Sequence, residues 1–575
     1  MTDDGDEPRR RSGPSRRLVV VLLVLGYLAS VAWRVWLSHS VVVPIAHTDE
    51  DSYLNAARVF AGGPGGFSSE NGALRRAGYQ LLISPAFLGE HSFTVSYGLV
   101  RVINALVNSA LLPLAYLLGT RVLAMPRGRA LAVAAVAATM PATIFYSLMA
   151  LTDSVLAALT VAWILLLALW LRRPERMLAA FGATAAAGAY YLIHVRGVVI
   201  LAVHVGVVLV WAVRRRLGWR PLAVALATVA AAVVGNQVLI ALLGDKLLLA
   251  GASPGGSTVD ALLSAKGAGF VLASLTTQLW YVLTITCGMA ALGWFSAVRL
   301  ITRRSVDPAR RWMAVAALAA TLGVALGCAL ILVGVPSASR DAVYARYIHA
   351  FAPLWLVFGL AVVFAARRRA LLTGWLAAAA LTAAGGGFVA WRVALEQRHG
   401  SPLRYGVFAA PDLMAMTAGW AGIRPLLGTA IALVGGTAIV LLCRLRWGWQ
   451  PVLALAVAGN LVMMGLLTVR VLHPYSVLLK PSPSLTSLGL RDGERVATST
   501  AYHLGIRLNH EHEITWTAVP NFVSVPPASA QVVIARWYPD PKDERHRWDW
   551  NGTKYGFHRV GGNAEQHWAL WRRDG

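Results

Sequence analysis

Three consecutive carboxylate residues, Asp49, Glu50 and Asp51, follow the first long apolar run of this 575-residue chain. The chain as a whole is basic, with 52 Lys and Arg against 27 Asp and Glu, so this concentration of negative charge is unusual. A carboxylate can remove the proton from a hydroxyl group as that hydroxyl attacks a reacting carbon. Adjacent carboxylates can also hold a divalent cation through their oxygen atoms. The alternative is an acidic loop that only faces solvent.

Two arginines, Arg75 and Arg76, lie further along the same polar segment, before another apolar stretch. A planar guanidinium group can donate two parallel hydrogen bonds to a phosphate, so this pair is a candidate clamp for a phosphate leaving group. The alternative is a pair of interfacial arginines that extend their charged ends into water.

Further charged and aromatic residues stand where apolar runs begin or end. Asp153 precedes one such run, where a carboxylate could serve chemistry or could cap a helix. His194 and Arg196 lie in a short turn between two runs, and Arg346 and Tyr347 lie at the start of a later one. Carboxylates and arginines gathered on one face would fit a substrate that has a hydroxyl nucleophile and a phosphate group.

The C-terminal part of the chain is polar and rich in histidine and tryptophan. His510 and His512 form a His-x-His pair that could bind zinc, but no further ligands follow at a known zinc spacing. The tryptophans could stack on sugars or form the core of a small domain. They include Trp516, Trp537, Trp548 and Trp550.

The composition predicts an α-helical polytopic membrane protein. The chain is 57% hydrophobic and 14% charged, whereas soluble proteins are about 25% charged. A basic excess in a soluble protein would indicate nucleic acid, but in a membrane protein it reflects Lys and Arg retained in cytoplasmic loops. We therefore expect the lipid bilayer, and no nucleic acid, as a partner. Cys287, Cys328 and Cys443 all lie in apolar runs, which argues against a disulfide framework or a cysteine metal site.

A membrane-crossing helix needs about 20 mostly apolar residues, and this criterion predicts about 13 transmembrane helices. Arginine clusters occupy every second gap between them, which predicts a cytoplasmic N-terminus (1–17) and an acidic segment outside the cytoplasmic membrane. The first run lacks a clear small-residue cleavage site, so we expect a retained helix. The predicted spans are 18–38, 96–119, 130–149, 153–171, 177–193, 197–213, 221–243, 276–299, 313–335, 347–366, 370–390, 425–443 and 451–471.

Two domains follow from this pattern: a transmembrane domain over 18–471 and a small extracytoplasmic domain over 472–575. Three long outside segments without obvious regular structure interrupt the first domain, at 39–95, 244–275 and 391–424. The second domain contains short β-prone pieces separated by turn residues, which predicts an α/β or mostly β fold. Those pieces are 495–498, 513–516, 531–535 and 567–571.

Several motifs resemble a known family. Asp49-Glu50-x-x-Tyr53, directly after the first helix, resembles the Asp-Glu motif of GT-C class glycosyltransferases that use polyprenyl-phosphate sugars. The resemblance is closest to the protein O-mannosyltransferase and aminoarabinose transferase (ArnT-like) group. The segment 77–85 is similar to that group's Gly-Tyr-Pro-Leu-Leu segment, although Gln80 replaces the proline. Leu151-Thr152-Asp153 resembles its second acidic position, and Arg346-Tyr347 with Pro353 is similar to the start of one of its late helices.

The resemblance implies a GT-C-like fold and inverting transfer of a hexosyl or pentosyl group, with mannose and arabinose-type sugars as the leading donors. It implies Asp49 as the base, ahead of Asp51 and Glu50, with Asp153 as a supporting acid. Metal use does not carry over from this family, so a divalent cation stays an open alternative. The remaining assignments are Arg75, Arg76, Arg196 and Arg346 for the donor phosphate, and Tyr53, His194 and Tyr347 for substrate.

The sequence therefore predicts a membrane glycosyltransferase that moves a sugar from a polyprenyl-phosphate donor to an acceptor on the outer face of the cell membrane. The acceptor could be a protein, a cell-wall glycan, a lipid or a peptide. A transporter or lipid flippase is the alternative, which predicts charged or broken helices at mid-membrane and paired repeats. A non-catalytic scaffold would tolerate Asp49→Asn and Asp153→Asn, whereas an enzyme would not.

Overall fold

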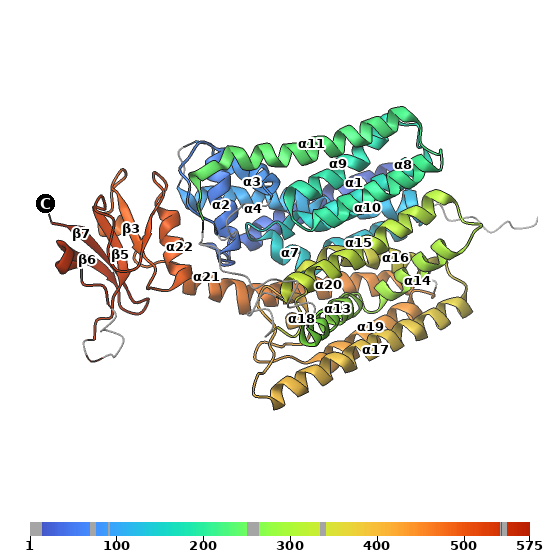
Figure 1. The fold of residues 1–575 in the computed structure, drawn as a ribbon. Helices are drawn as coiled ribbons and strands as arrows, with labels where there is room; N and C mark the ends of the chain where they lie inside the picture. The colour runs from blue at the N-terminus through green and yellow to red at the C-terminus, as the bar shows by residue number, and fades with distance from the viewer. Residues whose placement is uncertain are drawn as a thin grey trace, which may run out of the picture.

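A bundle of helices makes up most of the molecule, and a small domain of sheet and helix lies at one end of it (Figure 1). The structure is a computed structural model. It describes residues 14–68, 76–89, 92–249, 264–333, 341–445, 447–540, 542 and 549–574.

Nine helical runs in the described residues are long and apolar enough to cross a membrane, and a tenth results if the bent pair α6 (Arg127–Ala138) and α7 (Pro141–Ser147) counts as one span. The predicted polytopic α-helical membrane fold is thereby confirmed, whereas the count of about 13 spans is not. The long runs are α1 (Arg16–Ser38), α4 (Phe93–Ser109) with α5 (Leu111–Leu117) and η2 (Leu118–Val122), α8 (Asp153–Arg172), α11 (Trp219–Leu243), α13 (Ala265–Ile285), α15 (Pro308–Leu332), α17 (Arg368–Arg398), α19 (Pro425–Leu442) and α20 to α21 (Trp449–Leu479). Shorter apolar helices are α9 (Met177–Ile193), α10 (Gly197–Val213), α14 (Met289–Thr302) and α16 (Ala352–Ala365).

The predicted span 276–299 is wrong, because the structure has two helices there, α13 and α14. They are separated by Thr286, Cys287 and Gly288. Cys287 and Gly288 have φ angles of 49° and 74°, a left-handed conformation that ends the first helix. Hydropathy does not detect this break because the residues on both sides of it are apolar.

Helix α8 is the most enclosed of the spans. Of its apolar window, 78% is buried inside the protein, against 11% for α1 and 17% for α11. Apolar side chains on α1 and α11 therefore face outward, where lipid is the favourable surrounding, while Trp163 and Trp170 of α8 are fully buried. Asp153, the first residue of α8, consequently lies deep among the helices and not at their periphery.

The segment predicted as the first outside loop contains two helices that the sequence did not predict, α2 (Asp49–Phe60) and α3 (Gly78–Ile83). The three consecutive acids form the first turn of α2, where the helix dipole favours negative charge. Strand β1 (Phe67–Ser68) pairs in parallel with β2 (Leu248–Leu249), which joins two of the predicted outside segments.

The C-terminal domain is α/β, one of the two predicted alternatives. Its sheet has the strand order β4-β3-β5-β7-β6, with parallel pairing in its first half and antiparallel pairing in its second. The predicted β segments 495–498, 531–535 and 567–571 coincide with strands, but 513–516 does not, because α22 runs up to its first residue. The elements are β3 (Val496–Ser499), α22 (Leu504–Glu513), β4 (Asn521–Phe522), β5 (Val532–Arg536), β6 (Phe557–Asn563) and β7 (Trp568–Arg573).

The boundary between the two domains differs from the predicted one at residue 472. Helix α20 (Trp449–Leu467) continues through the π-helical turn Thr468–Leu472 into α21 (His473–Leu479), so 472 lies inside a helical run. That run leads from the bundle to the C-terminal domain (Figure 1). Helix α17 likewise continues to Arg398, eight residues into the segment predicted as the third outside loop.

Close packing of α14 against α16 depends on Gly359. An alanine there would place its Cβ 2.0 Å from the carbonyl oxygen of Met289, so the two helices would have to separate. We expect Gly359→Ala to lower the free energy of unfolding by about 1–3 kcal/mol. The control is Gly387→Ala on α17, where the added Cβ meets open space. Thermal unfolding in detergent measures both variants, and equal midpoints would contradict the predicted contact.

Candidate active site

Two arginines and two aspartates from four separate segments form a chain of ion pairs. Nη1 of Arg346 donates to Asp49 Oδ2 at 2.6 Å, and its Nε donates to Asp153 Oδ2 at 2.8 Å. Nη2 of Arg196 donates to the other oxygen of Asp153 at 2.7 Å. The sequence predicted all four residues as site residues, and the structure brings them together. We call Asp49, Arg346, Asp153 and Arg196 the ion-pair chain.

The ion-pair chain runs from the interior of the protein toward its surface. The side chain of Asp153 is fully buried, and those of Arg196 and Arg346 are nearly so, whereas 42% of the Asp49 side chain is exposed. A buried charge is costly unless it is paired, which explains why Asp153 has an arginine on each oxygen. Asp49 is therefore the acid of the ion-pair chain that is open to solvent.

The first turn of α2 places its three acids in three different surroundings. Glu50 is buried and accepts hydrogen bonds from four donors, so its carboxylate holds the local structure together. Asp51 is also buried, and lies between His47 and His512 at 3.0 and 2.8 Å. The four donors to Glu50 are the backbone N–H groups of Ile45, Ala46 and Ala150 and the hydroxyl of Tyr97, at 2.7–2.8 Å.

His194 and Tyr347 lie beside Arg196. The backbone N–H and Nε of Arg196 donate to Nδ1 of His194, at 3.0 and 3.2 Å. Burial and the adjacent guanidinium lower the pKa of His194 well below its usual range, so the ring is neutral and can accept these bonds. Nη1 of Arg196 donates to the carbonyl of Tyr347 at 3.1 Å, and its guanidinium lies 4.8 Å from the Tyr347 ring centre.

Two further predicted residues, Arg76 and Tyr53, have aromatic neighbours. Arg76 stacks on the ring of Tyr191 at 4.0 Å and is near enough to His194 to help lower that histidine's pKa. Tyr53 packs edge-on against Tyr79, with ring centres 5.4 Å apart, within the hydrophobic core. Arg75 lies outside the described residues.

Sequence reasoning missed two residues that support the site. Tyr97 donates to Glu50 from α4, and nothing in its surroundings in the sequence marks it. His349 donates from Nδ1 to the carbonyl of Arg346 at 2.6 Å, and its Nε2 is buried without a partner among the described residues. The three-residue spacing from Arg346 was the available signal for His349.

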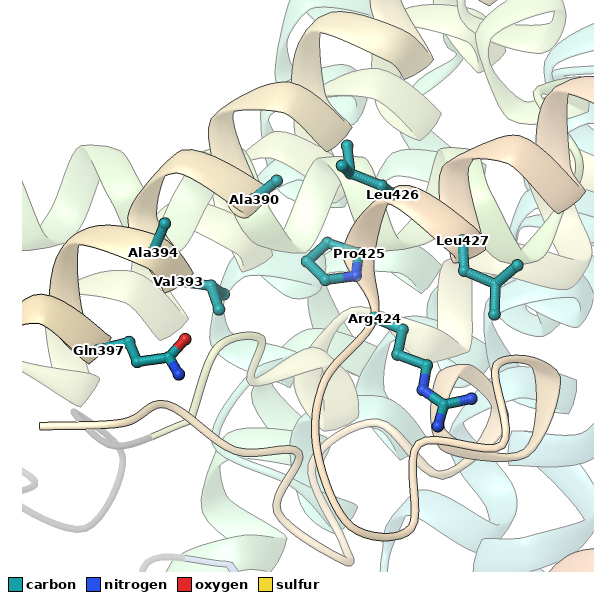
Figure 2. A pocket seen from close by; sticks show the side chains of 8 residues that line it. All are labelled: Ala390, Val393, Ala394, Gln397, Arg424, Pro425, Leu426 and Leu427. Carbon is teal, nitrogen blue, oxygen red and sulfur yellow. The ribbon is translucent and has the colours of Figure 1, made fainter.

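The described residues contain an apolar groove but no cluster of metal-ligating side chains. No group of three or more His, Cys, Asp or Glu side chains there is arranged to hold a metal ion. An apolar groove of about 300 Å³ lies between the end of α17 and the start of α19, with Arg424 at its edge (Figure 2). Its lining side chains include none of the predicted site residues among those described, so it is not part of the ion-pair chain.

Comparison with known proteins shows that the chain shares its fold with solved structures. No family model and no curated protein matches the chain. Among solved structures, the chain is similar to ArnT from Cupriavidus metallidurans bound to undecaprenyl phosphate, with 15% identity over 97% of this chain and 98% of that one and a TM-score of 0.54. The apo structure of the same protein gives 15% identity, coverage of 96% and 98%, and a TM-score of 0.52. The GT-C-like fold that the motifs implied is thereby confirmed.

Replacement of Glu50 tests its structural role. In Glu50→Gln an NH₂ group would face backbone N–H donors that now have an acceptor. Each orphaned buried donor costs about 1–3 kcal/mol, so we expect a clear fall in the thermal midpoint of the purified protein. Glu175→Gln, at an exposed position, is the matched control and should leave the midpoint unchanged. A Glu50→Gln protein as stable as wild type would show that these bonds contribute little.

Proposed function

We propose that this protein is a membrane glycosyltransferase that transfers a sugar from a polyprenyl-phosphate donor to a hydroxyl acceptor, with Asp49 as the general base. The observation that carries the proposal is the ion-pair chain, in which the exposed Asp49 carboxylate is held by the same guanidinium that binds the buried Asp153. An accessible base, Asp49, is thus in direct contact with a guanidinium group, Arg346, that is fixed in position by Asp153.

The proposed reaction is a single displacement. The acceptor oxygen attacks the sugar's anomeric carbon, and the bond from that carbon to the phosphate oxygen breaks. The phosphate leaves with the bonding electron pair, and the acceptor proton moves to Asp49. Attack from the side opposite the leaving group inverts the anomeric centre. Because a phosphate is already a good leaving group, one base suffices and no acid need protonate it.

The arginines and Asp153 have different roles in this proposal. Arg346 and Arg196 stabilise the negative charge that develops on the departing phosphate, because they are fixed in position before the reaction starts. A phosphate that takes Arg346 as its partner frees Asp49 from its ion pair, so donor binding would prepare the base. Asp153 keeps both guanidinium groups in place and is too deeply buried to reach the acceptor. Arg76, beside His194, adds a further positive charge nearby.

The shared fold supports the choice of donor. The ArnT structure to which this chain is similar contains undecaprenyl phosphate, a polyprenyl phosphate. Mannose and arabinose-type sugars are the first donors to test. The arginine clusters in alternate gaps support a location in the cytoplasmic membrane, with the N-terminus inside and Asp49 and the C-terminal domain on the outer face.

The decisive measurement is sugar transfer by purified protein in vesicles supplied with labelled polyprenyl-phosphate sugars and an extract of candidate acceptors. Asp49→Asn should lower kcat by about 10²- to 10⁴-fold, because the amide cannot accept the proton, while labelled donor still binds. Asp492→Asn, at an exposed position in the C-terminal domain, should transfer like wild type.

Two outcomes would contradict the proposal. If wild-type protein releases sugar from none of the donors, the glycosyltransferase assignment fails; movement of intact donor across the bilayer would then favour the flippase alternative. If Asp49→Asn transfers sugar at the wild-type rate, the protein is an enzyme whose base lies elsewhere.

A further inference from the structure

We infer that the C-terminal domain helps to position the active site. In this inference His512 is a positioning residue, which fixes the first turn of α2 through its hydrogen bond to Asp51. This inference rests on the proposed function, since Asp49 is the proposed base and begins the same helical turn. It assigns a role to the C-terminal domain and to Asp51, neither of which the proposed reaction uses directly.

The contact itself is a buried hydrogen-bonded triad. Nε2 of His512 donates to Oδ1 of Asp51 at 2.8 Å, and Nδ1 of His47 donates to its Oδ2 at 3.0 Å. All three side chains are less than 10% exposed. Burial would raise the pKa of Asp51, but the two histidines outweigh it and hold that pKa well below its usual range. Asp51 is therefore a carboxylate throughout the neutral pH range.

The triad is one of several contacts that hold α22 on the bundle. The ring of His512 stacks on Phe93 at the start of α4, with ring centres 4.3 Å apart and planes within 6°. Nδ2 of Asn509 donates to the carbonyl of Pro44 at 3.3 Å, and Nη1 of Arg58 donates to the carbonyl of Ile514 at 3.3 Å. The end of α22 thus lies against both the first and the last turn of α2.

Helical geometry connects Asp51 to Asp49. Residues two apart on a helix point about 200° from each other, so Asp51 faces the C-terminal domain while Asp49 faces Arg346. Glu50, between them, binds backbone and Tyr97 on the bundle. Thr48, just before the turn, has a φ of 26°, a conformation that non-glycine residues adopt only when surrounding contacts impose it. Removing the His512 contact would release one of these three attachments.

Asp51 acts by position and not by chemistry. Its side chain is fully buried and both of its oxygens accept from histidine, so an acceptor hydroxyl cannot reach it. The other charged groups near the triad are Glu50, Glu511 and Arg58, and each of these also has partners of its own. A loss of activity on changing His512 would therefore report the placement of Asp49.

The test compares two substitutions of His512 in the full-length protein. His512→Phe keeps an aromatic ring for Phe93 but removes the donor to Asp51, whereas His512→Gln keeps an N–H donor. We expect His512→Phe to lower kcat at least tenfold with the donor KM within twofold of wild type, and His512→Gln to restore most of that loss. His503→Phe, at the exposed N-cap of the same helix, should behave as wild type.

A measurement independent of activity accompanies these rates. Thermal midpoints of Asp51→Asn, His512→Phe and the double variant show whether the two residues are coupled. If they interact, the double variant should lose less stability than the sum of the losses in the two single variants. Additive losses would overturn the inference whatever the activity. Coupled midpoints with full activity in His512→Phe would also overturn it and leave the proposed function intact. Wild-type protein inactive with every donor, with coupling present, would instead refute the proposed function.

Discussion

The carboxylate of Asp153 is the constraint on which the arrangement of this end of the molecule depends. A fully buried negative charge requires compensation, and here it takes an arginine on each oxygen, from the α9–α10 turn and from the segment before α16. Two arginines with one aspartate leave one positive charge in excess. Asp49 supplies the balance, so α2 is drawn onto the bundle by the same requirement that fixes the arginines.

Electrostatics and helix geometry divide the work of the three consecutive acids. Asp49 completes the charge balance at the edge of the buried cluster, Glu50 satisfies backbone N–H groups that would otherwise be buried without partners, and Asp51 meets the C-terminal domain. Because successive residues on a helix point about 100° apart, a single turn can make all three contacts. A residue inserted into this turn would misdirect at least two of them.

The sequence predicted the membrane-helical fold because long apolar runs are typical of membrane spans. It predicted the residues of the ion-pair chain because charged side chains near the ends of such runs are costly unless they are paired or functional. It did not predict which acid had which partner. The donors to Glu50 are mostly backbone groups, which carry no sequence signal, and His512 is 461 positions away from Asp51. Helix α2 was missed because it is short and only partly apolar. The break at Cys287 and Gly288 was missed because it depends on backbone conformation within an unbroken apolar run.

The length of the continuous helical run from α20 to α21 affects the height of the C-terminal domain above the membrane. Its 31 residues span about 46 Å at 1.5 Å per residue, while a bilayer's hydrocarbon core is about 30 Å thick. A helical run of this length extends about 16 Å beyond the hydrocarbon core if it is parallel to the membrane normal, and less if it tilts. The elevation of the C-terminal domain above the lipid is thus set by membrane thickness as well as by the protein. A thicker membrane would bring the domain closer to the lipid or would reduce the tilt of the helical run.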